Sequence, residues 1–259
     1  MANFNALITP IGENLSSQEI LLQQLSSNIR ITPTFIDAGG LAVASKLDAS
    51  VNRSAIVANN LATTNSFLQT QDGVLQSATK IMDRMGQLKA MSEGIWGDNT
   101  GAFQAEFEIL NSQLADLSNQ QFNGVDLFSN SGGTLTAIGD ESGFSTFTID
   151  QADLENAVID ITSEANLADV TMADIEDSIQ NIANLRAANG GQQSRVLASF
   201  DLMQTNNSNL NSALSTIIDV DLARTLTDFS LVSLKTEVGF KMLSEALTSS
   251  VTVDNLLLS

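Results

Sequence analysis

The chain has 259 residues and a formal net charge of -19, and it contains neither cysteine nor histidine, which excludes disulfides, thiol chemistry, imidazole bases and the usual zinc sites. The shortage of Lys and Arg argues against nucleic acid and anionic membranes as partners, because phosphates would stay unneutralised. Only two prolines occur and aromatic residues make up 5%, which favours long helices packed by Leu, Ile, Val and Ala over a core of large rings.

The start of the chain gives no sign of a targeting segment. Residues 1–11 contain no Lys or Arg and no sustained apolar run, so we expect no cleaved secretory signal peptide. No uncharged apolar stretch of about 18 residues occurs, so we expect no membrane span.

The first expected helix covers residues 4–29. Its apolar seam steps by alternating fours and threes, the spacing that keeps one helix face on a partner helix. This seam contains Phe4, Ile8, Ile11, Leu15, Gln18, Leu22, Leu25 and Ile29. Pro10 lies inside the pattern, so the helix is expected to be secure only beyond it. Pro33 and Gly39-Gly40 then predict an extended connector and a turn.

A second, very long helix is expected from residue 41 to about residue 94. It has two parallel columns of strict seven-residue spacing, which suit burial by two or more neighbouring helices. The columns are Leu61, Leu68, Leu75 and Met82, and Phe67, Val74, Ile81 and Leu88.

A turn at residues 94–101 precedes a third helix at 103–119, and Asn123-Gly124 predicts a tight turn after it. Two short strands, at about 134–138 and 144–149, are expected to form a hairpin. The acidic segment from residue 150 to residue 168 has weak periodicity and no assigned structure.

The longest seam runs from Ile175 to Ile217. It contains Ile175, Ile179, Ile182, Arg186, Asn189, Gln193, Val196, Phe200, Met203, Asn207, Leu210, Leu214 and Ile217. A single helix of this length would extend about 65 Å, so it needs other long helices beside it. A further amphipathic stretch follows Asp221 and places Leu222, Leu226 and Phe229 on one face.

Two polar features allow more than one interpretation. Arg186, Asn189 and Gln193 lie on the seam, where polar groups more often set the register between helices than bind a ligand. Asp219 and Asp221 could begin a metal loop, but no further oxygen ligands follow at calcium-loop spacing, so a helix cap is the better interpretation.

Several motifs together resemble the bacterial flagellins. They are Leu25-Ser-Ser-Asn-Ile-Arg-Ile31, Asp37-Ala-Gly-Gly-Leu-Ala-Val43, Gln121-Phe-Asn-Gly124, Gly191-Gln-Gln-Ser-Arg195, Ile218-Asp-Val-Asp-Leu-Ala223 and Leu256-Leu-Leu258. They occur in the family's order and leave out only about residues 130–168.

The resemblance implies a mainly α-helical fold, an elongated rod of long antiparallel helices with one small β-hairpin and with paired N- and C-terminal helices. It implies three parts: terminal helices at 1–42 and 219–259, a helical rod at 43–129 and 169–218, and a hairpin insert at 130–168.

The function implied is that of a non-enzymatic structural subunit of the flagellar filament, with a hook–filament junction protein as the alternative. The implied partners are further copies of the chain, the flagellar export apparatus and its chaperone, and the junction and cap proteins, with no cofactor. The implied location is outside the cell, reached without a cleaved signal peptide.

The seams and the resemblance together predict an assembly interface. Its expected residues are Leu15, Leu22, Leu25, Ile29, Phe122, Asn123, Gly124, Arg186, Leu222, Leu226, Phe229, Leu234, Leu256, Leu257 and Leu258. Gly86 occupies the place of an arginine that contacts the toll-like receptor in recognised flagellins, so weak receptor signalling is expected.

Overall fold

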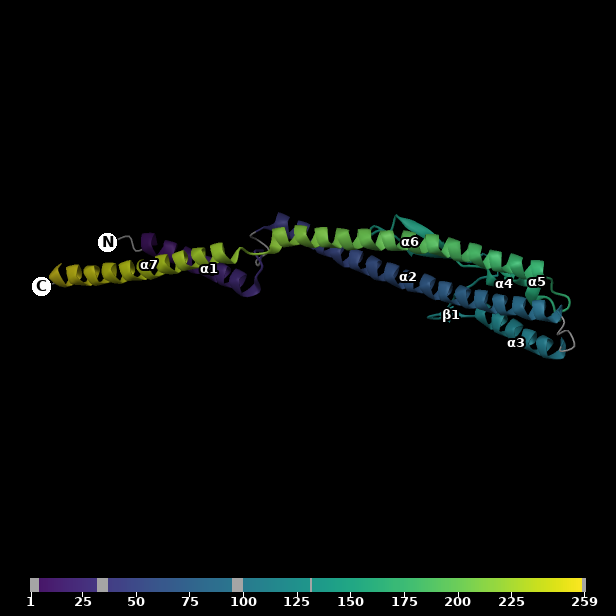
Figure 1. Cartoon of the computed structure of the whole chain (residues 1–259). Coiled ribbons are helices and arrows are strands. Elements are labelled where there is room, and N and C mark those ends of the chain that lie inside the picture. Colours follow the sequence, from purple (N-terminus) through teal and green to yellow (C-terminus); the bar gives the residue numbers. More distant parts are fainter. Residues whose placement is uncertain (1–4, 32–36, 95–99, 131, 258–259) are drawn as a thin grey trace. The chain divides into compact units, whose positions relative to one another are not determined.

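The computed structural model describes residues 5–31, 37–94, 100–130 and 132–257 (Figure 1). The chain divides into two compact units. One contains residues 1–51 and 208–259, and the other contains residues 52–207. The helices α2 (Ala38–Ser92) and α6 (Met172–Ile218) run from one unit into the other.

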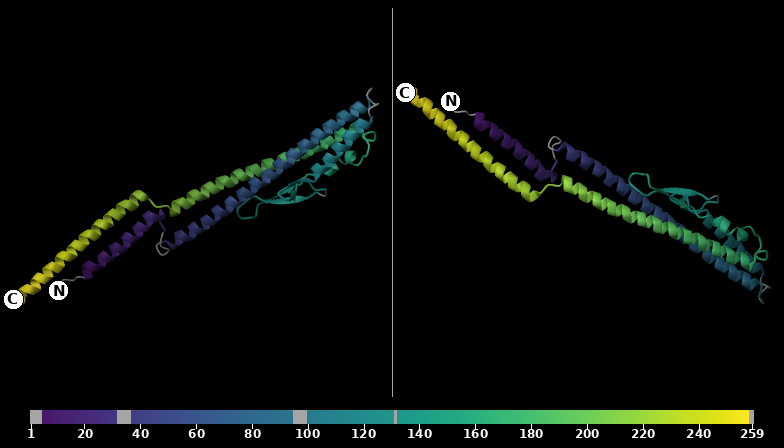
Figure 2. Two further views of the ribbon diagram at one scale, coloured as in Figure 1. Left: turned by 90° about the horizontal axis from the view of Figure 1, so that it is seen from below. Right: turned by 90° about the horizontal axis from the view of Figure 1, so that it is seen from above.

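The first unit is built on helices α1 (Asn5–Ser27) and α7 (Leu222–Leu257), which lie side by side and antiparallel (Figures 1 and 2). Ile11 is buried between them, together with Thr225 and Thr236. A Cβ atom added to Gly239 would lie 2.9 Å from Cγ1 of Ile11. Glycine at this position therefore lets the two helix backbones approach closely.

The connectors that follow α1 and α6 are joined to each other in the same unit. Ile29 and Asp219 form an antiparallel bridge, and the backbone N–H of Arg30 donates to the Ile218 carbonyl at 2.7 Å. Nη2 of Arg30 donates to the Ile217 carbonyl at 2.8 Å, which satisfies an acceptor at the end of α6.

Carboxylates cap the helices that begin beside these connectors. Oδ1 of Asp37 accepts from the N–H of Gly40 at 2.7 Å, and Oδ1 of Asp221 accepts from the N–H of Arg224 at 3.1 Å. The capping interpretation of Asp221 is thus confirmed.

The second unit packs α2, α6 and α3 (Thr100–Ser118) around one core (Figure 1). Leu61, Leu68, Leu75 and Met82, the first predicted column of α2, are at most 1% exposed. On α6, every residue of the predicted seam is buried or half-buried, and the helix continues through Gly190 and Gly191. The two long helices expected from periodicity are therefore confirmed.

Small elements cover one flank of this core. Strands β1 (Gln121–Phe122) and β2 (Val125–Asp126) form one antiparallel hairpin, and β3 (Thr134–Ile138) pairs with β4 (Thr146–Asp150) in a second. Short helices α4 (Leu154–Ala157) and α5 (Ile159–Thr162) follow.

Four expectations need correction. Helix α1 begins at Asn5, before Pro10 rather than beyond it. Pro10 is the sixth residue of α1, just beyond the four N–H groups that have no helical partner, so it removes one backbone hydrogen bond and the helix continues through it. The segment at 150–168, to which the sequence assigned no structure, forms α4 and α5, which bury Leu154 and Ile161 in the core. The first hairpin was expected only as a turn.

The fourth correction concerns the second hairpin, where β4 starts at Thr146 rather than near Phe144. The carboxylate of Asp140 accepts from the Ser142 hydroxyl at 2.8 Å, and the N–H of Gly139 donates to the Ser145 carbonyl at 2.7 Å. This longer turn takes up Phe144, which is 91% exposed.

Candidate assembly surface

The pair α1–α7 leaves most of its large apolar side chains in solvent. We call these side chains the terminal apolar face. They are Ile8, Leu15 and Leu22 on α1, and Leu222, Leu226, Leu231, Leu234, Val238, Phe240, Met242, Leu247 and Val251 on α7, each between 44% and 59% exposed. Apolar groups in such number are typical of a surface that another molecule covers.

These side chains are exposed because a different face of α7 packs against α1. The side chains of α7 that are buried against α1 include Thr225 and Thr236, and Gly239 lies at the close contact with Ile11. Small side chains allow a close helix pair but bury little apolar area. The leucines of α7 therefore keep about half of their surface in water.

The outer part of the terminal apolar face has helical spacing. Leu231, Leu234, Val238 and Met242 follow one another by three, four and four residues, so they form one stripe along α7. Three residues of this stripe, Leu234, Val238 and Met242, line a groove of about 320 Å³ together with residues of α1 that include Leu7 and Pro10. At about 25 cal/mol per Å² of apolar area, covering the stripe would stabilise a complex substantially.

The structure places several predicted interface residues on this face. Leu15, Leu22, Leu222, Leu226 and Leu234 are all exposed members of it. Leu25 and Phe229 are half-buried, and Ile29 is 39% exposed beside the bridge to Asp219. Their role in assembly stays a prediction.

The predicted C-terminal residues lie at or beyond the end of the described part. Leu256 and Leu257 belong to α7, but their side chains are outside the described structure, and Leu258 lies outside the described residues. Leu231, Val238 and Met242 were missing from the expected interface, although their spacing in the sequence is visible.

The predicted residues of the Gln-Phe-Asn-Gly turn serve the fold of the second unit. Asn123 and Gly124 have φ values of 52° and 79° and connect β1 to β2 in a two-residue turn. The ring of Phe122 contacts Phe67 edge to face, with centroids 6.1 Å apart. This arrangement fixes the hairpin on α2.

Arg186 also makes its contacts within the chain. Its Nε and Nη2 donate to the two carboxylate oxygens of Asp72 on α2 at 2.9 and 3.3 Å. These hydrogen bonds raise the pKa of Arg186. Asn189 is buried and Gln193 half-buried, and both donate to the Leu68 carbonyl. The contacts support the register interpretation of this polar seam.

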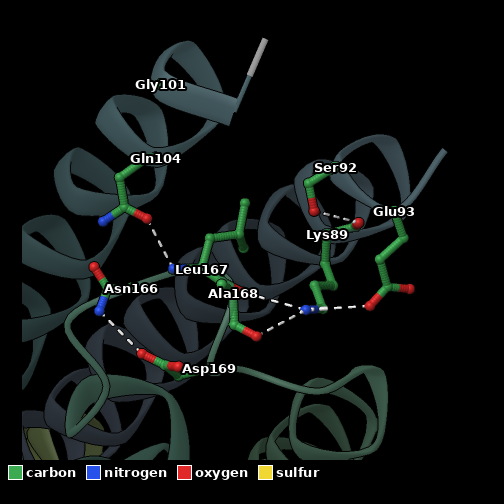
Figure 3. Close-up of a pocket in the computed structure, with 9 residues that line it drawn as sticks. All are labelled: Lys89, Ser92, Glu93, Gly101, Gln104, Asn166, Leu167, Ala168 and Asp169. Carbon is green, nitrogen blue, oxygen red and sulfur yellow. Dashed lines mark hydrogen bonds and ion pairs between the residues drawn. The ribbon is translucent and has the colours of Figure 1, made fainter. Parts of the chain in front are cut away.

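A cavity of about 540 Å³ lies where α2 ends beside α3 (Figure 3). Nζ of the buried Lys89 donates to the carbonyls of Leu167 and Ala168 at 3.3 Å and pairs with Glu93 at 3.1 Å. Oε1 of Gln104 accepts from the N–H of Leu167 at 2.8 Å. The polar groups around this cavity pair with one another, so they anchor the segment before α6.

No helix in the described part of the chain has a stretch that is both long and apolar enough to cross a membrane. Long helices with a buried core in one unit and half-exposed apolar side chains in the other are typical of helical structural proteins that associate with other chains.

Comparison with known proteins identifies the family. The model of the bacterial flagellin N-terminal helical region matches residues 2–132, and that of the C-terminal helical region matches residues 172–257. The chain belongs to the bacterial flagellin family. It is accordingly a structural subunit of the flagellar filament, and the junction-protein alternative is not favoured.

Individual relatives agree over most of the chain. Flagellin FlaB2 of Treponema pallidum is 29% identical over 94% of this chain and 93% of its own length. The flagellin of Halalkalibacterium halodurans is 26% identical, covering 91% of this chain and 90% of the relative. A crystal structure of Bacillus cereus flagellin matches 60% of this chain and 94% of its own, with 21% identity and a TM-score of 0.49.

Proposed function

We propose that copies of this chain polymerise by burying the terminal apolar face of α1–α7 against one another. The observation that carries the proposal is the half-exposed stripe Leu231, Leu234, Val238 and Met242, which α1 leaves uncovered. A stripe that contacts a different surface on the next copy gives a heterologous contact, which propagates as an open helical filament.

The predicted residues Leu15, Leu22, Leu222, Leu226 and Leu234 would then be interface residues. Leu25, Ile29 and Phe229 would support them from within the unit. Leu256, Leu257 and Leu258 would extend the same apolar face. Phe122, Asn123, Gly124 and Arg186 would act indirectly, by holding the second unit in shape.

The test compares two exposed leucines. Leu234→Asp on α7 and Leu202→Asp on α6 make the same change at 57% and 55% exposure. We expect Leu234→Asp to prevent filament growth and Leu202→Asp to retain it, as measured by electron microscopy and sedimentation of purified subunits. Both monomers should remain folded, since Asp on an exposed helix face costs about 0.5 kcal/mol.

Two outcomes count against the proposal. Filaments of normal length from Leu234→Asp would show that the terminal apolar face is not required. If both variants lost filaments equally, residues of both units would be required for assembly, and α7 would have no special role.

We further propose that the three-part organisation at 1–42 with 219–259, 43–129 with 169–218, and 130–168 corresponds to inner, middle and outer parts of the filament subunit. Residues 133–171 lie between the two family matches, which supports an insert there. Export would proceed through the flagellar export apparatus with a chaperone and without a cleaved signal peptide, and the junction and cap proteins would contact the filament ends. Catalysis has no part in this function.

A further inference from the structure

A chain of buried amides connects α6, α2 and the first hairpin in the second unit. Nε2 of Gln193 donates to Oδ1 of Asn189 at 2.6 Å, and Nδ2 of Asn189 donates to Oε1 of Gln71. Nε2 of Gln71 donates in turn to the Leu127 carbonyl at 2.6 Å. Gln71 is 1% exposed and Asn189 is 3% exposed, so water does not compete for the bond between them, whereas Gln193 is half-buried.

The apolar packing around this chain is repetitive. On α2 the buried column is Leu61, Leu68, Leu75 and Met82, and on α6 it is Ile175, Ile182, Asn189, Val196 and Met203, each with strict seven-residue spacing. If α6 slipped by seven residues, about 10 Å along the helix, most of its column residues would again face apolar side chains of α2 of similar size. Apolar burial alone therefore discriminates weakly between these pairings.

Buried polar side chains interrupt this repeat. Asn189 lies within the α6 column, and Ser54 and Lys89 continue the α2 column at its two ends. After such a slip, Ile182 or Val196 would replace Asn189 beside Gln71. Oε1 of Gln71 would then lose its donor, and Asn189 would lose its bonds to Gln71 and to the Leu68 carbonyl. Arg186 would also leave Asp72, with which it now forms two hydrogen bonds. Each buried amide left unpaired lowers the population of a slipped pairing by about tenfold to a hundredfold.

Gln71, the last of the three amides, links the pairing of α2 with α6 to the first hairpin. Asn189 holds Oε1 of Gln71, which turns Nε2 of the same amide toward Leu127, the residue directly after β2. Without Asn189, nothing in this chain of amides orients Gln71 toward Leu127.

We propose that Gln71 and Asn189 form a register lock. The lock selects one among the pairings of α2 with α6 that differ by seven residues, and in that pairing alone it holds the segment after hairpin β1–β2. The proposal concerns the single subunit and does not depend on polymerisation.

Distance measurement between spin labels tests the lock directly, because the chain has no cysteine of its own. Labels on cysteines introduced at Gln76 of α2 and Gln204 of α6, both exposed, report the axial position of one helix along the other. We expect one distance in the parent chain and in Asn184→Leu, an exposed control on α6. Asn189→Leu should add a second population displaced by about 10 Å.

A second readout follows the hairpin. Hydrogen exchange across residues 120–128 should accelerate at least tenfold in Asn189→Leu and Gln71→Leu and stay unchanged in Asn184→Leu. Asn189→Ala removes the donor without adding volume, so it replaces Asn189→Leu if the larger side chain prevents folding.

A single, parent-like distance in folded Asn189→Leu and Asn189→Ala would overturn the register lock. Unchanged exchange at residues 120–128 in Gln71→Leu would overturn the coupling to the hairpin.

Discussion

Single side chains tie the helices of the second unit together at their surface. Arg84 of α2 donates from Nε and Nη2 to the two carboxylate oxygens of Glu106 on α3, at 2.6 and 3.0 Å. Both side chains are about 40% exposed, so the pair contributes modestly to stability. The two-point geometry mainly fixes where α3 lies along α2.

This pair makes a prediction about titration. The hydrogen bonds from Arg84 lower the pKa of Glu106, and partial burial opposes them. Because the folded pKa lies below the ordinary glutamate value of about 4.3, the contribution to stability is complete above that value. It is lost as the pH falls through the lowered pKa.

We expect Arg84→Ala to raise the pKa of Glu106 toward its ordinary value, as followed by NMR titration of the carboxylate. Arg186→Ala, which breaks the other two-point pair, is the matched control and should leave the Glu106 pKa where it is. An unchanged Glu106 pKa in Arg84→Ala would contradict the assignment.

At the scale of elements, α1 and α7 can lie close together because Gly239 of α7 faces Ile11 of α1. The contact of Gly239 with Ile11 leaves no room for a Cβ atom unless Ile11 moves, and Ile11 is a stiff β-branched side chain that is 6% exposed. Around Gly12, on the same helix pair, no atom of the described residues lies within 4 Å of an added Cβ atom.

Valine substitutions at these two glycines should therefore differ. We expect Gly239→Val to destabilise the pair by about 1–3 kcal/mol through overpacking, and Gly12→Val to change stability by no more than about 0.5 kcal/mol. Thermal unfolding of the subunit and hydrogen exchange of α1 measure both effects. Equal behaviour of the two variants would mean that α1 and α7 are not held in close contact.

At the scale of the whole molecule, the two units differ in how much of their apolar side chains is exposed to solvent. The second unit buries its predicted columns within one chain, and the first exposes apolar side chains along both of its helices. We infer that the second unit folds in the free subunit and that the first gains much of its stability when copies associate.

A chain that ends at Ile218 tests this division, because it lacks all of α7. We expect this variant to stay soluble, to keep the cooperative unfolding of the second unit, and to form no filaments. Circular dichroism and electron microscopy measure these properties. Filaments from this chain would refute the role of α7, and loss of cooperative unfolding would refute the independence of the second unit.

The sequence by itself determined the helices and most of the core. Seven-residue columns such as Leu61 to Met82 need only the local rule that residues seven apart share a helix face, and α2 and α6 follow it. Asn123-Gly124 specified its turn for an equally local reason, since both residues tolerate positive φ. The absence of histidine and cysteine excluded whole classes of chemistry without any structure.

Only the tertiary structure decided which faces meet. Periodicity shows that α7 has apolar stripes, but the face turned to α1 is the one with Thr225, Thr236 and Gly239, because small residues permit the closest approach. The spacing of Gln71, seven residues before Ala78, puts it on the buried side of α2, but its hydrogen-bond partners Asn189 and Leu127 are far from it in the chain and only the fold brings them together. Which helix faces pack together depends on how well two surfaces fit each other, whereas the periodicity of one segment describes only the surface of that segment.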